Sequence, residues 1–533
     1  MGTLQLPADF QFSYENSVSY PQNLVYRASY LGALQAYTSR LDTAVPKLLV
    51  EKDTDADVPF RDFRPTGQGA PFKKQNILSD AALKEWLGDQ STTDPNSPGS
   101  VATKVDPKCR FIFLWAAHSR ASLKITRRML VRILSYHQVM PGYLDFISVF
   151  GAQNLPRDLR FSGFREQTLL SNSARRQSVP ALGRSGRQFQ LCYNLKTVSC
   201  LSPSTPTKNK EWSIRQAAFH HQFDVDEGTT LWIVTKGNLE IKKRIQDMTG
   251  KDGRPEDKSF GTPAECFKSS LAVHLLNSHW STEDWRWYVQ WLEDVVDNET
   301  HIAVWGPRGM GEHRREYRPD DLQAVQDYED KTNEVVMVLE ANMDVLISLR
   351  KFYENLLKNK NFDLKEACEE DILQFATQVN NMIYDSRMQI ARAKLLVQII
   401  DDRKNLILQH LQSQATESME DLTRKMHNIG IMAQKEAVAM RIITVVTLIF
   451  LPATFVSTFF STDVVKYQNQ NSRTGSFSKI AMVRWLEVAL PLTVVTLSVG
   501  YIWFIRADKN RKHEISCEER LPRYESESKP SIT

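Results

Sequence analysis

The sequence predicts an α/β head, a long helical stalk and two membrane helices near the C-terminus. Three observations predict this fold class. Uncharged apolar runs occupy residues 442–462 and 488–505 of a 533-residue chain in which 24% of all residues are charged. An apolar stripe with helical spacing leads into the first run. Strand-like and helix-like segments alternate in the first half of the chain, which is typical of an α/β domain.

We expect seven parts along the chain. They are a partly irregular N-terminal region (residues 1–104), an α/β cytosolic head (105–330), a helical hairpin and stalk (331–441), a first transmembrane helix (442–462), an outer loop (463–484), a second transmembrane helix (485–505) and a polar cytosolic tail (506–533).

The α/β head is indicated by short apolar runs that alternate with a longer helical pattern. Residues 110–116, 188–195 and 230–235 have the composition of strands, and residues 120–136 have helical periodicity. Polar segments rich in proline and serine separate these runs and are expected to be exposed loops.

The stalk is predicted from a stripe of apolar residues without helix breakers. Between residues 371 and 460 the only proline is Pro452. A helix of about 90 residues is about 135 Å long at 1.5 Å per residue, too long to be buried in one globular domain. Residues 335–357 form a second amphipathic run, which a turn at 358–363 can fold back on the stalk. An ordinary two-stranded coiled coil is the alternative interpretation.

The two apolar runs have the length and the flanks of membrane helices. A hydrocarbon core about 30 Å thick needs roughly 20 apolar residues of helix. Trp485, Tyr501 and Trp503 near the ends of the second run suit the interfacial belt, and basic residues flank the pair. We therefore expect a multi-pass integral membrane protein with both termini in the cytosol or a matrix compartment. Two buried core helices of a soluble protein are the alternative.

Hydroxyl side chains gather on one face of the first apolar run. At about 100° per residue, one third of the circumference holds the following residues: Thr444, Thr447, Leu451, Thr454, Thr458, Ser461 and Thr462. Such a stripe can line a polar path, or it can bond to the helix backbone and join neighbouring helices.

The first apolar run resembles the first membrane helix of the CorA-type divalent-cation transporters. The resemblance rests on residues 444–460, with the core Ile449-Phe-Leu-Pro-Ala-Thr-Phe-Val456, followed by a short loop and one last helix. Residues 135–146, 212–224 and 280–288 are similar to segments of filamentous-fungal CorA-like membrane proteins. The likeness spans roughly residues 105–505. It implies a CorA-like fold in which the stalks of a homo-oligomer, a pentamer, line an inner funnel.

The resemblance also implies a set of site residues. The path would be lined by Met440, Thr444, Thr447, Leu451, Thr454 and Thr458, with the apolar Met440 and Leu451 as constrictions that gate by dewetting. The family carries Gly-Met-Asn at the outer mouth, whereas this chain has Ser461-Thr462-Asp463. A ring of Asp463 carboxylates would attract hard divalent ions, and Asp463 is the predicted metal residue. A solvated residue at a helix end is the alternative for Asp463.

The function predicted from these features is passive movement of divalent cations, with magnesium first, through a homo-oligomer in a lipid bilayer. A non-conducting membrane-tethered scaffold or sensor is the alternative. The formal net charge of +4 gives no case for nucleic-acid binding, and neither an HExxH motif nor a Gly-rich phosphate loop occurs. We expect no enzyme activity and no cofactor other than the transported or regulatory cation. Acidic residues near Asp320, Asp321, Asp327, Glu329 and Asp330 suggest either a regulatory cation site between subunits or a solvated helix face.

Overall fold

The computed structural model describes residues 6–64, 72–89, 104–152, 161–201, 211–305, 317–461 and 479–518. The chain divides into two compact units, Met1–Leu411 and Gln412–Thr533. The first unit contains the sheet and most of the helices. The second contains the end of one long helix and the last helix of the chain.

A seven-stranded mixed sheet organises the first unit, with the order β2-β1-β3-β7-β6-β5-β4. Only β3 and β7 pair in parallel, and every other neighbouring pair is antiparallel. The strands are β1 (Val58–Phe63), β2 (Lys73–Ile77), β3 (Cys109–Trp115), β4 (Phe164–Leu169), β5 (Gln188–Cys200), β6 (Trp212–Asp224) and β7 (Thr230–Lys236).

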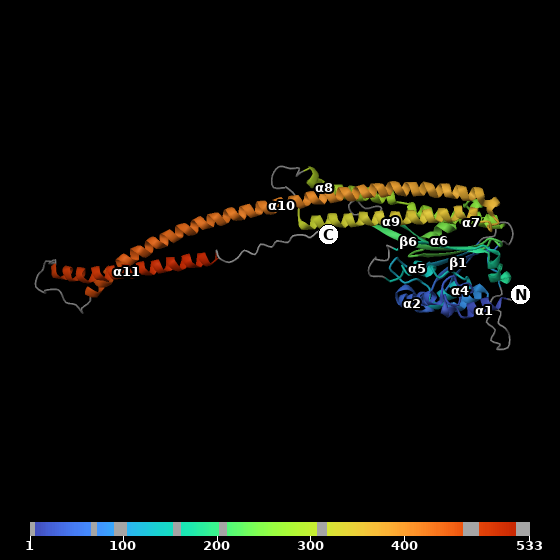
Figure 1. The fold of residues 1–533 in the computed structure, drawn as a ribbon, viewed down its shortest axis with the longest axis horizontal. Helices are drawn as coiled ribbons and strands as arrows, with labels where there is room; N and C mark the ends of the chain where they lie inside the picture. The colour runs from blue at the N-terminus through green and yellow to red at the C-terminus, as the bar shows by residue number, and fades with distance from the viewer. Residues whose placement is uncertain are drawn as a thin grey trace. The chain divides into compact units, whose positions relative to one another are not determined.

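Both faces of the sheet are covered by helices (Figure 1). In β3, Ile112 and Leu114 enter the core shared with the N-terminal helices, whereas Phe111 and Phe113 enter a second core on the opposite face. The first face carries α1 (Ala8–Glu15), α2 (Leu31–Leu48), α3 (Asp80–Leu87), α4 (Arg127–Tyr136) and α5 (Tyr143–Ile147). The second carries α6 (Glu240–Met248), α7 (Pro263–Thr282), α9 (Pro319–Lys358) and the start of α10 (Lys365–Phe460).

The segment before residue 105 contributes to this sheet and its first core. Strands β1 and β2 and helices α1 to α3 all come from this segment, for which the sequence pattern predicted a separate, partly irregular region. The domain boundaries as such stay predictions. Short 3-10 helices complete the first unit at Ser17–Ser19, Asp53–Asp55, Asn172–Gln177, Pro180–Leu182 and Pro255–Lys258.

The predicted hairpin of two long helices is present. Helix α9 packs along the first part of α10, and α8 (Trp285–Trp305) joins them in a third core that includes Val335, Leu339, Ala393 and Ile400. Ion pairs such as Lys394–Glu340, at 2.7 Å, connect α10 to α9 at the solvent-exposed surface. The long helix expected over residues 371–460 is therefore confirmed as part of α10.

One buried cation sits where the sheet meets α9. Lys196 of β5 is almost fully buried, its backbone N–H donates to Asn342 Oδ1, and its ammonium donates to the Phe161 carbonyl at 2.8 Å. Burial lowers the pKa of Lys196 to about 8, although the negative charge of Glu334 acts to raise it. The protonated ammonium therefore costs folding free energy at neutral pH.

Lys196→Met is expected to raise the free energy of unfolding by about 1–3 kcal/mol at pH 7. The Phe161 carbonyl keeps a partner, because Asn194 Nδ2 also donates to it. The pKa of Lys196 is lower in the folded protein than in the unfolded chain, so the stability of the wild type rises between about pH 8 and 10.5. The stability advantage of Lys196→Met over the wild type therefore shrinks over this range. Denaturant midpoints of the full chain in detergent at pH 7 and pH 10 check this. A lower midpoint for the variant at pH 7 would contradict it, and the exposed Lys243→Met is the control.

Candidate functional site

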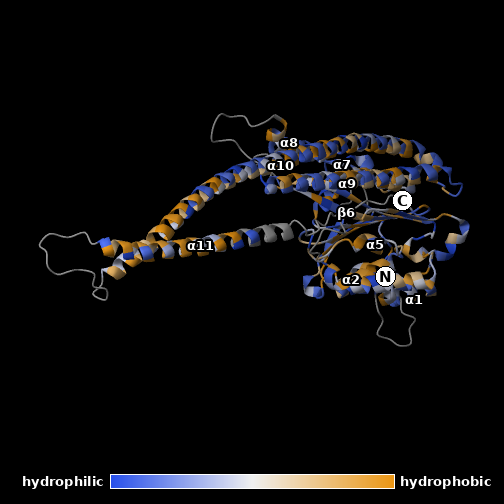
Figure 2. Ribbon diagram, turned by 60° about the vertical axis from the view of Figure 1, so that its left-hand side comes forward, coloured by the Kyte–Doolittle hydropathy of each residue, from blue (hydrophilic) through white to orange (hydrophobic). Residues whose placement is uncertain are grey.

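The apolar end of α10 and helix α11 (Lys479–Glu518) form the second unit. Both are long and apolar enough to cross a membrane. Their large side chains are exposed instead of packed in a core, with 62% of Phe450, 69% of Leu451 and 64% of Phe455 accessible. Figure 2 shows hydrophobic residues dominating both segments. Exposed apolar surface of this extent fits a lipid or protein environment, not the core of a soluble protein.

The contact between the two helices uses one defined face of α10. Pro452 and Val456 are buried there, as is Ala489 of α11. Trp485 of α11 donates its indole N–H to Ser457 Oγ at 3.0 Å. The Pro452 ring therefore lies in a protected contact, where neighbouring groups can compensate for the missing backbone donor.

The hydroxyl stripe lies on the opposite face of α10. At about 100° per residue, Thr454 and Thr458 are roughly 200° and 240° around the helix from Pro452. Both side chains are exposed in the second unit, and so are Thr444 and Thr447. These four hydroxyls therefore stay exposed in a single chain, although Leu492 and Thr496 of α11 border the same open groove as Thr454 and Thr458.

Each hydroxyl of the stripe that the structure describes donates to a carbonyl of its own helix. Thr444 reaches the Met440 carbonyl at 2.7 Å, Thr454 that of Phe450 at 3.0 Å and Thr458 that of Thr454 at 3.0 Å. A donating hydroxyl keeps its oxygen lone pairs, which point away from the backbone and can accept from water or approach a cation. These bonds are those expected if the stripe only bonds to its own helix backbone. They are also compatible with a stripe that lines a polar path.

The structure brings some of the predicted path residues together. Leu451, Thr454 and Thr458 border one open groove beside α11, together with Leu492 and Thr496. Met440, Thr444 and Thr447 lie on the same helix but do not border that groove. At the predicted mouth, Ser461 Oγ donates to the Thr458 carbonyl at 2.7 Å. Thr462 and Asp463 lie outside the described residues, so the role of Asp463 as a metal residue stays a prediction.

Part of the acidic segment at the start of α9 is engaged in bonds within the chain. Asp321 caps the helix by accepting from the Arg318 backbone N–H at 2.8 Å, and Glu329 pairs with Lys404 of α10 at 2.5 Å. Across the described residues of one chain, no group of three or more His, Cys, Asp or Glu side chains is placed to hold a metal ion. The regulatory cation site between subunits stays a prediction.

Buried histidines of the head form a chain of hydrogen bonds. His274 Nδ1 lies 2.8 Å from the Tyr193 hydroxyl, His274 Nε2 lies 3.1 Å from His221 Nδ1, and His221 Nε2 lies 3.1 Å from Thr230 Oγ1. Burial lowers the pKa of His274 to about 3, so the imidazole is neutral at pH 7. These side chains join β5, β6, β7 and α7 and act as satisfied core residues.

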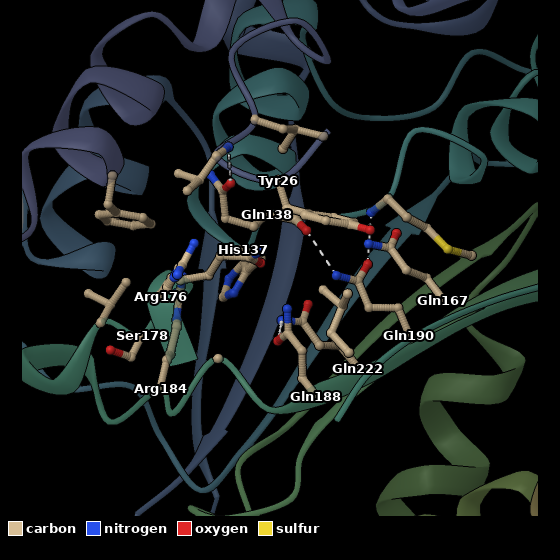
Figure 3. Close-up of a pocket in the computed structure, with 18 of the residues that line it drawn as sticks. Tyr26, His137, Gln138, Gln167, Arg176, Ser178, Arg184, Gln188, Gln190 and Gln222 are labelled. Atoms are coloured by element: carbon tan, nitrogen blue, oxygen red, sulfur yellow. Dashed lines mark hydrogen bonds between the residues drawn. The ribbon is translucent and has the colours of Figure 1, made fainter. Parts of the chain in front are cut away.

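A polar pocket of about 60 Å³ lies between the N-terminal helices and the sheet. Figure 3 shows Arg176 and Arg184 on one side, His137 in the middle, and Gln188, Gln190 and Gln222 on the other side. Arg184 Nε donates to Asp106 at 2.6 Å, and Gln190 Nε2 donates to the Gln138 carbonyl at 3.0 Å. Arg184 Nη1 also donates to the Tyr136 carbonyl at the end of α4, at 2.6 Å. The bonds of Arg184 and Gln190 therefore hold the end of α4 and the following turn in place, a structural role that the sequence did not reveal.

The mixed sheet, the paired long helices and the two exposed apolar helices define an integral membrane protein with a folded head. The sequence identifies the family, because residues 12–304 match the family model described as CorA-like transporters. This match covers more than half of the chain, which therefore belongs to the CorA-like family. The resemblance seen in the sequence is confirmed, and the family is one of transporters, not enzymes.

Solved structures provide distant similarities. The complete CorA magnesium transporter from Methanocaldococcus jannaschii has 11% sequence identity and a TM-score of 0.33, and 83% of this chain aligns with 96% of that one. The full-length CmaX protein has 11% identity and a TM-score of 0.31, with coverages of 86% and 99%. The soluble domain of the same CorA has 11% identity and a TM-score of 0.31, with coverages of 60% and 96%. No curated protein matches the sequence significantly.

Proposed function

We propose that this protein is a metal ion transporter that lets divalent cations, magnesium first, move passively across a bilayer. The observation that carries the proposal is the exposed hydroxyl stripe of α10, opposite the face that contacts α11. A polar face on a membrane helix is costly in lipid and is stable where it faces other protein or water. Several chains that turn this face toward a common axis would form a water-filled path.

The proposed assembly is a homo-oligomer, with five copies as the family resemblance implies. Thr444, Thr447, Thr454 and Thr458 would supply oxygen atoms to a hydrated cation, since hard divalent ions prefer oxygen ligands. Met440 and Leu451 would form the apolar constrictions that open and close by wetting. A ring of Asp463 side chains at the mouth would concentrate divalent cations, with slower release as the cost of tighter binding.

Thr454→Val is expected to reduce magnesium flux into liposomes about tenfold, because it replaces one ring of path oxygens with methyl groups while keeping the side-chain shape. The measurement is dye-reported uptake by the purified, reconstituted full chain, with manganese, cobalt and nickel run in parallel. Thr493→Val is the matched control, since Thr493 lies on α11 and donates to the Ala489 carbonyl at 2.7 Å.

The outcomes of the flux experiment separate the two functional hypotheses. Flux that Thr454→Val lowers and Thr493→Val leaves unchanged supports a path along the stripe. An intact oligomer that moves none of the four ions would favour a non-conducting scaffold or sensor. A stable monomer or dimer by native mass spectrometry would contradict the proposed path, because so few copies cannot enclose it.

A further inference from the structure

The polar pocket of Figure 3 has a smaller cavity beside it, and the two share one wall. The pocket measures about 60 Å³ and the smaller cavity about 30 Å³. The side chains that border both are those of His137, Arg184, Gln188 and Gln222. One water needs roughly 10–15 Å³ of such space, so the pocket has room for a polyatomic ligand.

The sheet supplies one free hydrogen-bond donor to this pocket. Gln188 and Gln190 lie two residues apart on β5, and Gln222 is the register partner of Gln190 on β6. Alternate residues of a strand share a face, so these amides lie on the same side of the sheet. Gln222 Nε2 donates to Gln188 Oε1 at 2.6 Å, and Gln188 Nε2 has no partner among the described residues. Unlike Gln222 Oε1, this nitrogen is not fully covered by protein.

His137 supplies a second free donor from the end of α4. The residue is only 5% exposed, and its Nε2 lies 3.3 Å from Arg110 Nη1. An arginine nitrogen can only donate, so Nε2 accepts and the neutral ring carries its hydrogen on Nδ1. Within the described part of the chain Nδ1 has no partner, and it too is not fully covered. Arg110 borders only the smaller cavity, so Nδ1, on the other side of the ring, lies on the side of the pocket.

The charges around the pocket favour an anion. Burial lowers the pKa of His137 well below its ordinary value, and the positive charges of Arg110 and Arg184 lower it further. Arg176 borders the pocket, is exposed, and forms no ion pair with a described residue. Asp9 also borders the pocket, but it is exposed, and solvent screens its charge. Buried donors are nearly always bonded, so the two free donors call for an acceptor from outside the chain.

We propose that this pocket binds a tetrahedral oxyanion of the phosphate class. Its oxygens would accept from His137 Nδ1, Gln188 Nε2 and the Arg176 guanidinium. Figure 3 shows His137 between Arg176 and Gln188 at the pocket. A tetrahedral anion offers acceptors in several directions, which suits donors that come from a helix end, a strand and a 3-10 helix. Binding here does not depend on the proposed transport function.

The test uses the full chain purified in detergent, with binding measured by calorimetry and by the shift in melting temperature. Inorganic phosphate is expected to bind and to raise the melting temperature, whereas potassium chloride at the same ionic strength controls for screening of surface charge. Glycerol 3-phosphate is the second probe. Tighter binding of this monoester than of inorganic phosphate would assign an esterified ligand, and weaker binding would assign the free anion.

Arg176→Gln is expected to weaken phosphate binding about tenfold, and its exposed position makes a folding defect improbable. Arg175→Gln is the matched control, because this neighbouring arginine pairs with Asp226 at 3.6 Å and does not border the pocket. Its loss should change affinity less than about threefold. His137→Gln keeps an acceptor for Arg110 but loses the Nδ1 donor, so it should also weaken binding at least about tenfold.

The melting temperature without ligand reports whether each variant folds. Phosphate that stabilises the chain no more than chloride does would overturn the proposal. Equal losses of affinity in Arg176→Gln and Arg175→Gln would overturn it as well, because they would show a general effect of surface charge. Unchanged affinity in a folded His137→Gln variant would show that the buried donor does not contact the anion.

Discussion

Asp62→Ala is expected to lower the free energy of unfolding of the head by about 3–5 kcal/mol. Asp62 of β1 and Arg110 of β3 are direct partners in the strand register, and each side chain is only 4% exposed. The guanidinium donates to both carboxylate oxygens, at 2.9 and 2.6 Å. Removing the carboxylate would leave a cation buried between two strands, and its desolvation would be offset only in part by Asp106, whose carboxylate lies 3.8 Å away.

Denaturant midpoints of the full chain in detergent check this expectation through the fluorescence of the buried tryptophans. Asp42→Ala is the control, because its partner Arg127 joins α2 to α4 at the surface and its loss should cost about 0–1 kcal/mol. The double variant Asp62→Leu with Arg110→Met should recover most of the loss, since it removes both charges. A single variant as stable as the control would show that the pair contributes little.

This ion pair illustrates why the strands near the N-terminus could not be predicted. Binary patterning treats a charged residue as solvent-exposed, yet Asp62 and Arg110 are buried because they neutralise each other. Strand β2 is an edge strand whose lysines and polar residues face solvent, so it has no apolar alternation to detect. In β6, His220 and His221 interrupt the apolar pattern although both are fully buried. The sequence therefore predicted β3, β5 and β7, and missed their neighbours.

The helix expected over residues 120–136 begins only at Arg127, where Thr126 caps it by accepting from the Met129 N–H. The residues before it are irregular and are held by bonds to other segments: Lys124 N–H donates to the Trp115 carbonyl at 2.7 Å, and Leu123 forms a β-bridge with Leu49. These bonds join segments far apart in the sequence, which local periodicity does not report. Tertiary contacts therefore override the helical pattern at this end.

Helix α10 was predictable because its stripe repeats over many turns without a breaker. The hydroxyl stripe was visible for the same reason, since a helix fixes which residues share a face. Which face contacts α11 was not predictable, because it depends on the burial of Pro452, Val456 and Ala489. The sequence also did not show that Ser119, Arg215 and Lys236 border one cavity at the ends of β3 and β7, because these residues meet only through the sheet topology.

Acid is expected to unfold the head, beginning below about pH 6.5, because its buried histidines are neutral when folded. Burial lowers the pKa values of His220 and His274 to about 3, and it lowers those of His137 and His221 well below the ordinary value, with nearby cations or histidines adding to the effect. The unfolded chain binds protons that the folded head does not, so stability is present above the unfolded pKa and is lost as pH falls. Each such histidine costs about 1.4 kcal/mol per pH unit, and four together reach about 8 kcal/mol at pH 5, comparable to the total stability of a domain.

His220→Phe is expected to reduce this acid sensitivity. The ring of His220 packs 5.3 Å from that of Tyr143, and among the described residues its Nδ1 bonds only to the Cys192 thiol, at 3.2 Å. Phenylalanine therefore fits the site with little loss of stability at pH 7.5. At pH 5 the variant should be about 2 kcal/mol more stable than the wild type, because one proton-binding group has been removed from the unfolded state. Denaturant midpoints across pH 4.5–8 measure the difference, with exposed His301→Phe as the control. If the curves of His220→Phe and the wild type run parallel over this range, the burial of a neutral His220 is not what makes the head sensitive to acid.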